Sequence, residues 1–198
     1  MRTHRKRDAG FTLPELLVAI ALFAIIAAAM TSLQTYMLNE QALTLTTSLA
    51  QESATLVGKA LRDGTAPATY IQTPAAGDRT SSLVVWANTD PVTLNPLDST
   101  MPVAWTDFCL DAQDRLLRYE GTGAMPAIDC GNTAGGVVVA GDPDRGLTVD
   151  LSLYRPEDDS NLLQLSYTVH LDARGKQPAL DISRDSQVAL PAARTPST

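Results

Sequence analysis

Residues 10–30 read GFTLPELLVAIALFAIIAAAM, and this stretch decides how the rest of the chain is organised. Four basic residues precede it in a short leader, and after Glu15 no charged residue occurs until Glu40. About 20 apolar residues at roughly 1.5 Å each span the hydrocarbon core of a bilayer, which is about 30 Å thick. Residues 16–38 are long enough to do so, although their far end is more polar. We therefore predict a membrane-spanning helix.

Glu15 is the unusual residue of this helix, because it places a carboxylate near the start of the apolar run. A charge inside a spanning helix costs roughly 2.5–3.5 kcal/mol on insertion scales, and residues kept there usually have a function. A buried carboxylate stays ionised when a cation compensates it. We therefore expect Glu15 to have a positively charged partner.

The sequence GFTLPELLVA at residues 10–19 resembles the processing motif of type IV prepilins and type II secretion pseudopilins. The resemblance implies that prepilin peptidase cuts between Gly10 and Phe11 and that the new amino terminus, Phe11, is N-methylated. It also implies that the Glu15 carboxylate faces the amino terminus of a neighbouring subunit in a filament. Pro14 departs from the usual pattern, since many pilins have an aliphatic residue there. Proline is tolerated in the first turn of a helix, where its missing N–H would be unpaired.

Two other interpretations of the N-terminus remain open. The basic leader, the apolar run and the alanines at 27–29 also fit an ordinary secretory signal cut near Met30. A plain membrane anchor fits the hydropathy as well. Neither explains a glycine, a phenylalanine and a glutamate at these spacings directly after the leader.

The charge of the chain is divided unevenly between the leader and the remainder. The chain has 198 residues, 44% of them hydrophobic, which suits a single domain with one modest core. Four of the 15 basic residues and one of the 22 acidic residues lie in the first ten positions, so the remainder has 11 against 21 and a net charge near −10. Basic flanks stay on the cytoplasmic side of a membrane. The acidic remainder would be exported and is unsuited to general nucleic-acid binding.

The first third of the chain is predicted to be one long helix. We expect a leader at 1–10, a transmembrane and filament-core helix at 11–38, and an amphipathic continuation at 39–64. The apolar stripe of the continuation is Leu38, Ala42, Leu45, Leu49, Leu56 and Ala60. Asp63-Gly64 and Pro67 then stop a rod that runs from about residue 13 to 62. A separate second helix, hinged near residues 31–35, is the alternative.

The remainder is predicted to be a β-rich exported domain at 65–190, which makes the fold α+β. Residues 147–154 and 163–171 alternate apolar and polar side chains around a polar turn, so they should pair as an antiparallel hairpin. Shorter strand candidates are residues 82–87, 116–120 and 136–140. One apolar face per strand predicts an antiparallel sheet that packs on the apolar face of the helix. Residues 65–80 and 87–106 are expected to be loops, and 191–198 a disordered tail.

Cys109 and Cys130 are the two cysteines of the chain, and both lie in the exported part. An even number of cysteines in an oxidising compartment indicates a disulfide. Closing a loop of about 20 residues stabilises a fold by roughly 3 kcal/mol in the chain-entropy model. Two separate buried thiols are the alternative.

Residues suited to catalysis or metal binding are few. One of the two histidines, His4, lies in the leader, and His170 falls on the polar face of a predicted strand, where no spacing supports a Ser-His-Asp arrangement. The acidic clusters at 142–146 and 157–159 offer oxygen ligands for calcium, but the first lacks the spacing of an EF-hand loop. We therefore expect no enzyme activity, no cofactor and no metal site, with calcium as the one candidate ligand.

The resemblance implies a structural subunit, a minor pilin or pseudopilin, of a type IV pilus or a type II secretion pseudopilus. Its partners would be prepilin peptidase, other pilin or pseudopilin subunits, the inner-membrane assembly platform and the lipid bilayer. It would sit in the bacterial inner membrane as a single-pass protein with a cytoplasmic leader, and then in a periplasmic or surface filament that serves secretion, motility, adhesion or competence. The alternative is a membrane-anchored binding module, for adhesion or DNA capture, that is not built into a filament.

Overall fold

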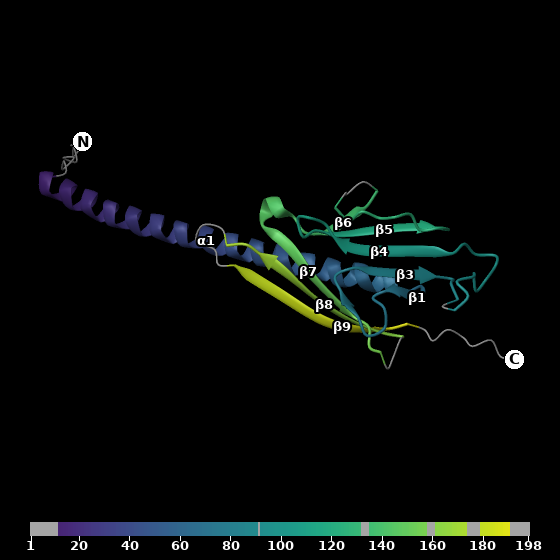
Figure 1. The fold of residues 1–198 in the computed structure, drawn as a ribbon. Coiled ribbons are helices and arrows are strands. Elements are labelled where there is room, and N and C mark those ends of the chain that lie inside the picture. The colour runs from purple at the N-terminus through teal and green to yellow at the C-terminus, as the bar shows by residue number, and fades with distance from the viewer. Residues whose placement is uncertain (1–11, 91, 132–134, 158–160, 174–178, 191–198) are drawn as a thin grey trace, which may run out of the picture. The chain divides into compact units, whose positions relative to one another are not determined.

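The long helix predicted for the N-terminal third is present in a computed structural model of the chain. The structure describes residues 12–90, 92–131, 135–157, 161–173 and 179–190. It divides into two compact units, Met1–Leu45 and Thr46–Thr198. Helix α1 (Leu13–Thr65) belongs to both units, and its helical assignment is unbroken, including at residues 31–35 (Figure 1). The continuous helix is therefore confirmed, and the hinged alternative is not observed.

The second unit contains two antiparallel sheets rather than the single sheet that we expected. The five-stranded sheet has the order β1-β3-β4-β5-β6, and the four-stranded sheet has the order β2-β7-β8-β9. The first sheet consists of β1 (Ala68–Thr73), β3 (Leu83–Ala87), β4 (Ala104–Leu110), β5 (Leu116–Thr122) and β6 (Val137–Ala140). The second consists of β2 (Arg79–Thr80), β7 (Leu147–Tyr154), β8 (Leu162–Leu171) and β9 (Leu180–Ala189). A short 3-10 helix, η1 (Pro143–Arg145), precedes β7. The α+β fold class is confirmed.

The hairpin predicted from alternation is formed by β7 and β8. Their register runs from Leu147 opposite Leu171 to Tyr154 opposite Gln164. Along β7 the side chains at 147, 149, 151 and 153 are buried, and along β8 every second side chain is buried. Period-2 alternation thus identified both the strands and the face that each one buries. The weaker candidates at 82–87, 116–120 and 136–140 correspond to β3, β5 and β6.

Several strands lie in segments that were predicted to be loops or for which no secondary structure was predicted. Residues 65–80 contain β1 and β2, and residues 87–106 contain the start of β4, so both loop predictions were partly wrong. Strand β9 was not predicted. Its sequence, LDISRDSQVA, has charged side chains at exposed positions because β9 is an edge strand covered on one side only. The predicted disordered tail at 191–198 lies outside the described residues.

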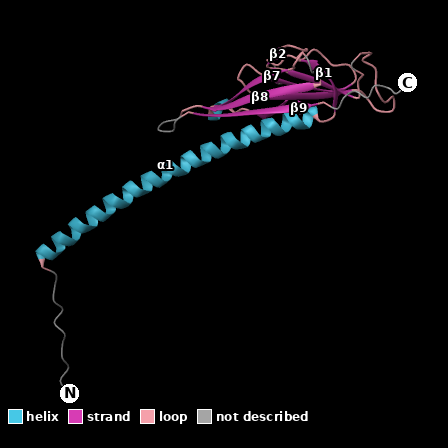
Figure 2. Cartoon of the chain, turned by 90° about the horizontal axis from the view of Figure 1, so that it is seen from below, coloured by secondary structure: helices cyan, strands magenta, loops and turns pink. Residues whose placement is uncertain are grey.

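The last turns of α1 lie beside the strands and form the core with them (Figure 2). Helix residues at 3–4 residue spacing are buried there: Ala50, Ala54, Val57 and Leu61. They pack in one cluster with the inner faces of both sheets, which include Phe108 from β4 and Val169 from β8. The helix therefore joins the two sheets into one hydrophobic core.

The buried face of α1 is not the stripe named from the sequence. Leu45 and Leu56 are exposed, at 65% and 45%, whereas Leu49 and Ala60 are partly buried against the core. Small residues face the sheets at several positions of the buried face, which also includes Val57 and Leu61. A Cβ added at Gly64 would lie 2.6 Å from Cε2 of Phe108, so the helix and β4 approach closely at this point. Close approach favours alanine and glycine over leucine, and this turns the contact face away from the leucine stripe.

The buried helix face predicts a strong difference between two leucines of α1. Leu61→Ala should lower the free energy of unfolding of the second unit by about 2–5 kcal/mol, because it leaves a cavity at a fully buried site. The matched control Leu56→Ala, at a site 45% exposed, should lower it by no more than about 1 kcal/mol. Urea unfolding of the detergent-solubilised chain, followed by near-UV circular dichroism, measures both. Equal losses in the two variants would contradict this packing.

Candidate functional site

The first turn of α1 is closed by a contact between Glu15 and Thr12. Oε2 of Glu15 accepts a hydrogen bond from the backbone N–H of Thr12 at 3.1 Å and another from its hydroxyl at 3.0 Å. The helix starts at Leu13, so Thr12 is the N-cap residue and Glu15 the third helical residue. This is the carboxylate half of a capping box. Its sequence pattern, T-x-x-E, was present at residues 12–15 but was not used in the prediction.

Pro14 is accommodated as expected, because it occupies the second helical position. The first N–H groups of a helix have no partner within the helix, so the ring of Pro14 costs no hydrogen bond there. The backbone N–H of Leu16 donates to the carbonyl of Thr12 at 3.2 Å, which closes the first turn. Gly10 and Phe11, the predicted processing site, lie outside the described residues.

The helix beyond Glu15 exposes an almost wholly apolar surface. Its large side chains between Leu16 and Leu38 are 52–73% exposed, and within Leu13–Thr65 an 18-residue window has a mean hydropathy of 2.6 with none of it buried in the protein. By length and composition this helix can cross a membrane. It lies near the N-terminus and is consistent with membrane anchoring.

Comparison with known proteins identifies this segment. Residues 5–31 match the family model of the prokaryotic N-terminal methylation motif. The chain carries the pilin-type signature. This motif is shared by type IV pilins and pseudopilins, which are structural subunits. The matched residues include Gly10, Phe11 and Glu15. No curated protein and no solved structure matched the chain, so the second unit is interpreted from its own structure.

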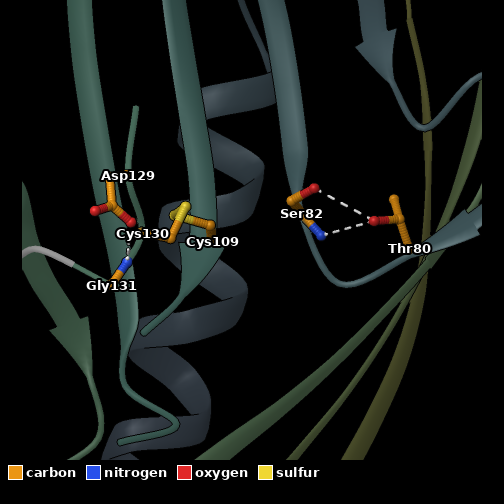
Figure 3. Close-up of a disulfide and its surroundings, with 6 residues drawn as sticks. All are labelled: Thr80, Ser82, Cys109, Asp129, Cys130 and Gly131. Carbon is orange, nitrogen blue, oxygen red and sulfur yellow. Dashed lines mark hydrogen bonds between the residues drawn. A yellow bond between two sulfur atoms is a disulfide. The ribbon is translucent and has the colours of Figure 1, made fainter. Parts of the chain in front are cut away.

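The second unit contains the predicted disulfide between Cys109 and Cys130, shown in Figure 3. Cys109 lies on β4 and Cys130 in the segment after β5, with Cα atoms 6.1 Å apart. The bridge holds this segment against the outer face of the five-stranded sheet, where Trp105, Leu117 and Tyr119 form a second hydrophobic cluster. Next to the bridge, Oδ1 of Asp129 accepts a hydrogen bond from the backbone N–H of Gly131 at 3.0 Å.

A short turn at Thr80 and Ser82 is drawn in the same figure as the disulfide. The hydroxyl of Thr80 accepts a hydrogen bond from the backbone N–H of Ser82 at 3.2 Å (Figure 3). This contact sets the short connection between β2 and β3, which belong to different sheets. A serine or threonine turn of this kind fixes the point at which the chain passes from one sheet to the other.

Asp107 is a buried carboxylate that the sequence analysis did not single out. It is 4% exposed, and its Oδ1 has no hydrogen-bond partner among the described residues. A carboxylate oxygen of Asp107 lies within 4.8 Å of both sulfur atoms of the disulfide. Burial raises the pKa of Asp107 from 3.8 to about 6. Since both cysteines are oxidised, they offer no thiolate to a metal here.

The other residues considered for chemistry are held in surface contacts. Nδ1 of His170 lies 2.9 Å from Oδ1 of Asp181 on the neighbouring strand β9, and among the described residues no serine hydroxyl bonds to this histidine. Asp142 caps η1 and forms an ion pair with Nε of Arg145 at 3.3 Å. This carboxylate of the candidate calcium loop thus has a cation of its own chain as partner. Asp158 and Asp159 lie outside the described residues.

The bridge predicts a measurable loss of stability when it is removed. The double variant Cys109→Ser, Cys130→Ser should lose about 3 kcal/mol of unfolding free energy, because the unfolded chain regains the entropy of an open loop. Chemical denaturation with and without a thiol reductant measures this loss. The reductant should destabilise the wild-type protein and leave the double variant unchanged. A wild-type protein insensitive to full reduction would contradict the prediction.

Asp107 predicts a particular dependence of stability on pH. The folded protein binds the proton more tightly than the unfolded chain, because the pKa of Asp107 is raised to about 6 from 3.8. Stability should therefore fall as pH rises from about 4 to 6 and then level off, a change of roughly 2–3 kcal/mol from this group.

Asp107→Asn should remove this part of the pH profile, whereas Asp185→Asn, at an exposed site on β9, should retain it. Urea unfolding at a series of pH values from 4 to 8 measures the difference between the profiles. Parallel profiles for wild-type and Asp107→Asn protein would show that Asp107 is not the group responsible.

Proposed function

We propose that the chain is a structural subunit, a minor pilin or pseudopilin, of a type IV pilus or a type II secretion pseudopilus. The observation that supports it most strongly is the methylation motif joined to an apolar helix with one acidic residue in its first turn. In this proposal prepilin peptidase removes residues 1–10, and Phe11 becomes the N-methylated first residue. The mature subunit waits in the bacterial inner membrane with its second unit exported.

The contact between Glu15 and Thr12 supports a specific role in assembly. Cleavage after Gly10 creates an amine on Phe11, one residue before the N–H that Glu15 already accepts. Oε2 of Glu15 is engaged with Thr12, whereas Oε1 has no partner among the described residues. In the proposal Oε1 receives the amine of a neighbouring subunit. The capping contact keeps the carboxylate at the helix start, in position for that amine.

The exposed apolar surface of α1 supports the assembly step. In lipid, or among copies of the same helix, the side chains from Leu16 to Leu38 meet equally apolar surroundings, so the hydrophobic effect hardly distinguishes the two states. Packing and the Glu15 contact would then set the register of subunits, with other pilins and the inner-membrane assembly platform as partners. No catalytic role is proposed for the chain.

A pair of glutamate variants tests the proposal in the native bacterium. Glu15→Ala should still be cut and methylated at Phe11, but the amount of the protein in sheared filaments should fall about tenfold or more, because the neighbour's amine loses its counter-charge. Glu40→Ala, which removes the next acid of the same helix, should assemble normally. Mass spectrometry of the mature terminus and immunoblotting of the filament fraction provide the two measurements.

Three results would contradict the proposal. A mature chain that begins at Met1 or near Met30 would show that the motif is not processed. Assembly of Glu15→Ala at the wild-type level would remove the role of Glu15, and a chain that stays in the membrane with no filament fraction would favour the anchored binding module.

A further inference from the structure

The outer face of the five-stranded sheet carries a row of aromatic side chains. Tyr70 on β1 is paired with Trp86 on β3, Trp86 with Trp105 on β4, and Trp105 with Gly121 on β5. Directly paired residues of antiparallel strands point to the same face. Tyr119 lies beside the row, in one cluster with Trp105. The row therefore contains both tryptophans of the chain.

A pocket lies at each side of this row. The first has a volume of about 310 Å³ and is lined by Tyr70, Gln72, Trp86 and Leu94, among others. The second, of about 330 Å³, is lined by Trp105, Tyr119, Ile128 and Asp129, among others. Because Trp86 and Trp105 are direct cross-strand partners, the two pockets adjoin across the middle of the sheet. From β1 to β5 the face spans three inter-strand spacings, or about 14 Å.

Close neighbours pack against several of the aromatic rings. A Cβ at Gly121 would lie 2.5 Å from Cζ2 of Trp105, and one at Gly136 would lie 2.6 Å from Cζ of Tyr119. The indole N–H of Trp86 donates to Oε1 of Gln72 at 2.6 Å. The indole N–H of Trp105 has no hydrogen-bond partner among the described residues, although Trp105 is 8% exposed. Because this nitrogen is itself buried, a ligand on the surface of the sheet cannot reach it.

The charges around the row restrict the chemistry of the ligand. Among the residues that the structure describes, no lysine or arginine lines either pocket. The second pocket contains the carboxylate of Asp129, and the buried Asp107 lies directly opposite Tyr119 across the strands. Glu120 also lines the second pocket, but its carboxylate is ion-paired with Arg118. Phosphate and sulfate groups need cationic partners, so nucleic acids and sulfated polymers do not fit this face. An uncharged or amino-bearing ligand does.

We propose that this face binds a neutral or amino-substituted oligosaccharide. The C–H faces of sugar rings pack on aromatic rings, and Tyr70 and Trp86 offer two partly exposed rings on neighbouring strands, with the buried Trp105 next to them in the row. Sugar hydroxyl groups both donate and accept. They can donate to the Asp129 carboxylate and to the side-chain carbonyl of Gln72. The pockets at the two sides provide room for more than one ring.

Tryptophan fluorescence can report binding at this face, because both tryptophans of the chain lie in the row. The full-length protein is purified in a polyoxyethylene detergent, which has no sugar headgroup, and its tryptophan emission is followed during titration with four probes. These are cellohexaose, a glucosamine hexamer, a heparin-derived hexasaccharide and an oligothymidylate of similar length. A saturable change is expected with cellohexaose or the glucosamine hexamer, and none with the two anionic probes.

Matched variants connect the signal to this face. Tyr70→Ala should weaken binding about tenfold, because it removes one stacking ring while both tryptophans stay in place. Tyr154→Ala, a similarly buried tyrosine on β7 of the other sheet, should bind as the wild type does. Asp129→Asn keeps the acceptor for Gly131 and should weaken the glucosamine hexamer more than cellohexaose. Circular dichroism and melting temperature establish that each variant is folded.

The proposal is overturned by the absence of a saturable signal with both uncharged and amino-bearing probes. Unchanged affinity of Tyr70→Ala, or a preference for the sulfated or nucleotide probe, would overturn it equally. The titration uses purified protein and depends neither on cleavage after Gly10 nor on assembly through Glu15. Its failure would leave the filament proposal intact, and failure of the filament proposal would leave the binding result intact.

Discussion

The two parts of helix α1 need different surroundings to cover their apolar side chains. Up to Leu45 the large apolar side chains of α1 have no cover from the protein itself, whereas from Ala50 onward one face is buried against the sheets. Apolar surface left in water costs about 25 cal/mol per Å², so the first part requires lipid or other helices. The second part requires the strands. The sheets cover one face of the helix from Ala50 onward.

The contact between helix and sheets depends on small residues on the helix and large ones on the strands. Ala50, Ala54 and Gly64 allow close approach, and Phe108 fills the space at the end of the helix. This division explains why the buried face leaves out Leu45 and Leu56, although it includes Leu61. Both sheets pack on the same helix, so without the helix the inner face of each sheet would be exposed to water. The main core of the second unit therefore includes the last turns of the same helix whose first part enters the membrane in the proposed function.

The sequence predicted those parts of the fold that are decided locally. Strands β7 and β8 alternate over eight or more residues, and their register follows from the turn between them. Glu15 and the cysteine pair were found because each is unusual for its surroundings. Strands β1, β2, β4 and β9 were missed. The side chains of β1, β2 and β9 suit an edge or a short connection as well as a loop, and β4 begins inside a segment that was predicted to be a loop. The division into two sheets, the close approach at Gly64 and the burial of Asp107 depend on residues far apart in the chain, which no local pattern records.

The disulfide has a consequence for how the second unit withstands proteolysis. It encloses β5 and residues 123–128, which have no regular secondary structure and include the exposed Gly123 and Ala124. Exposed segments of this kind are where proteases cut first. After one such cut the two fragments remain covalently joined through Cys109 and Cys130, and β5 keeps its place between β4 and β6. The bridge thus makes the outer face of the sheet tolerant of a broken backbone.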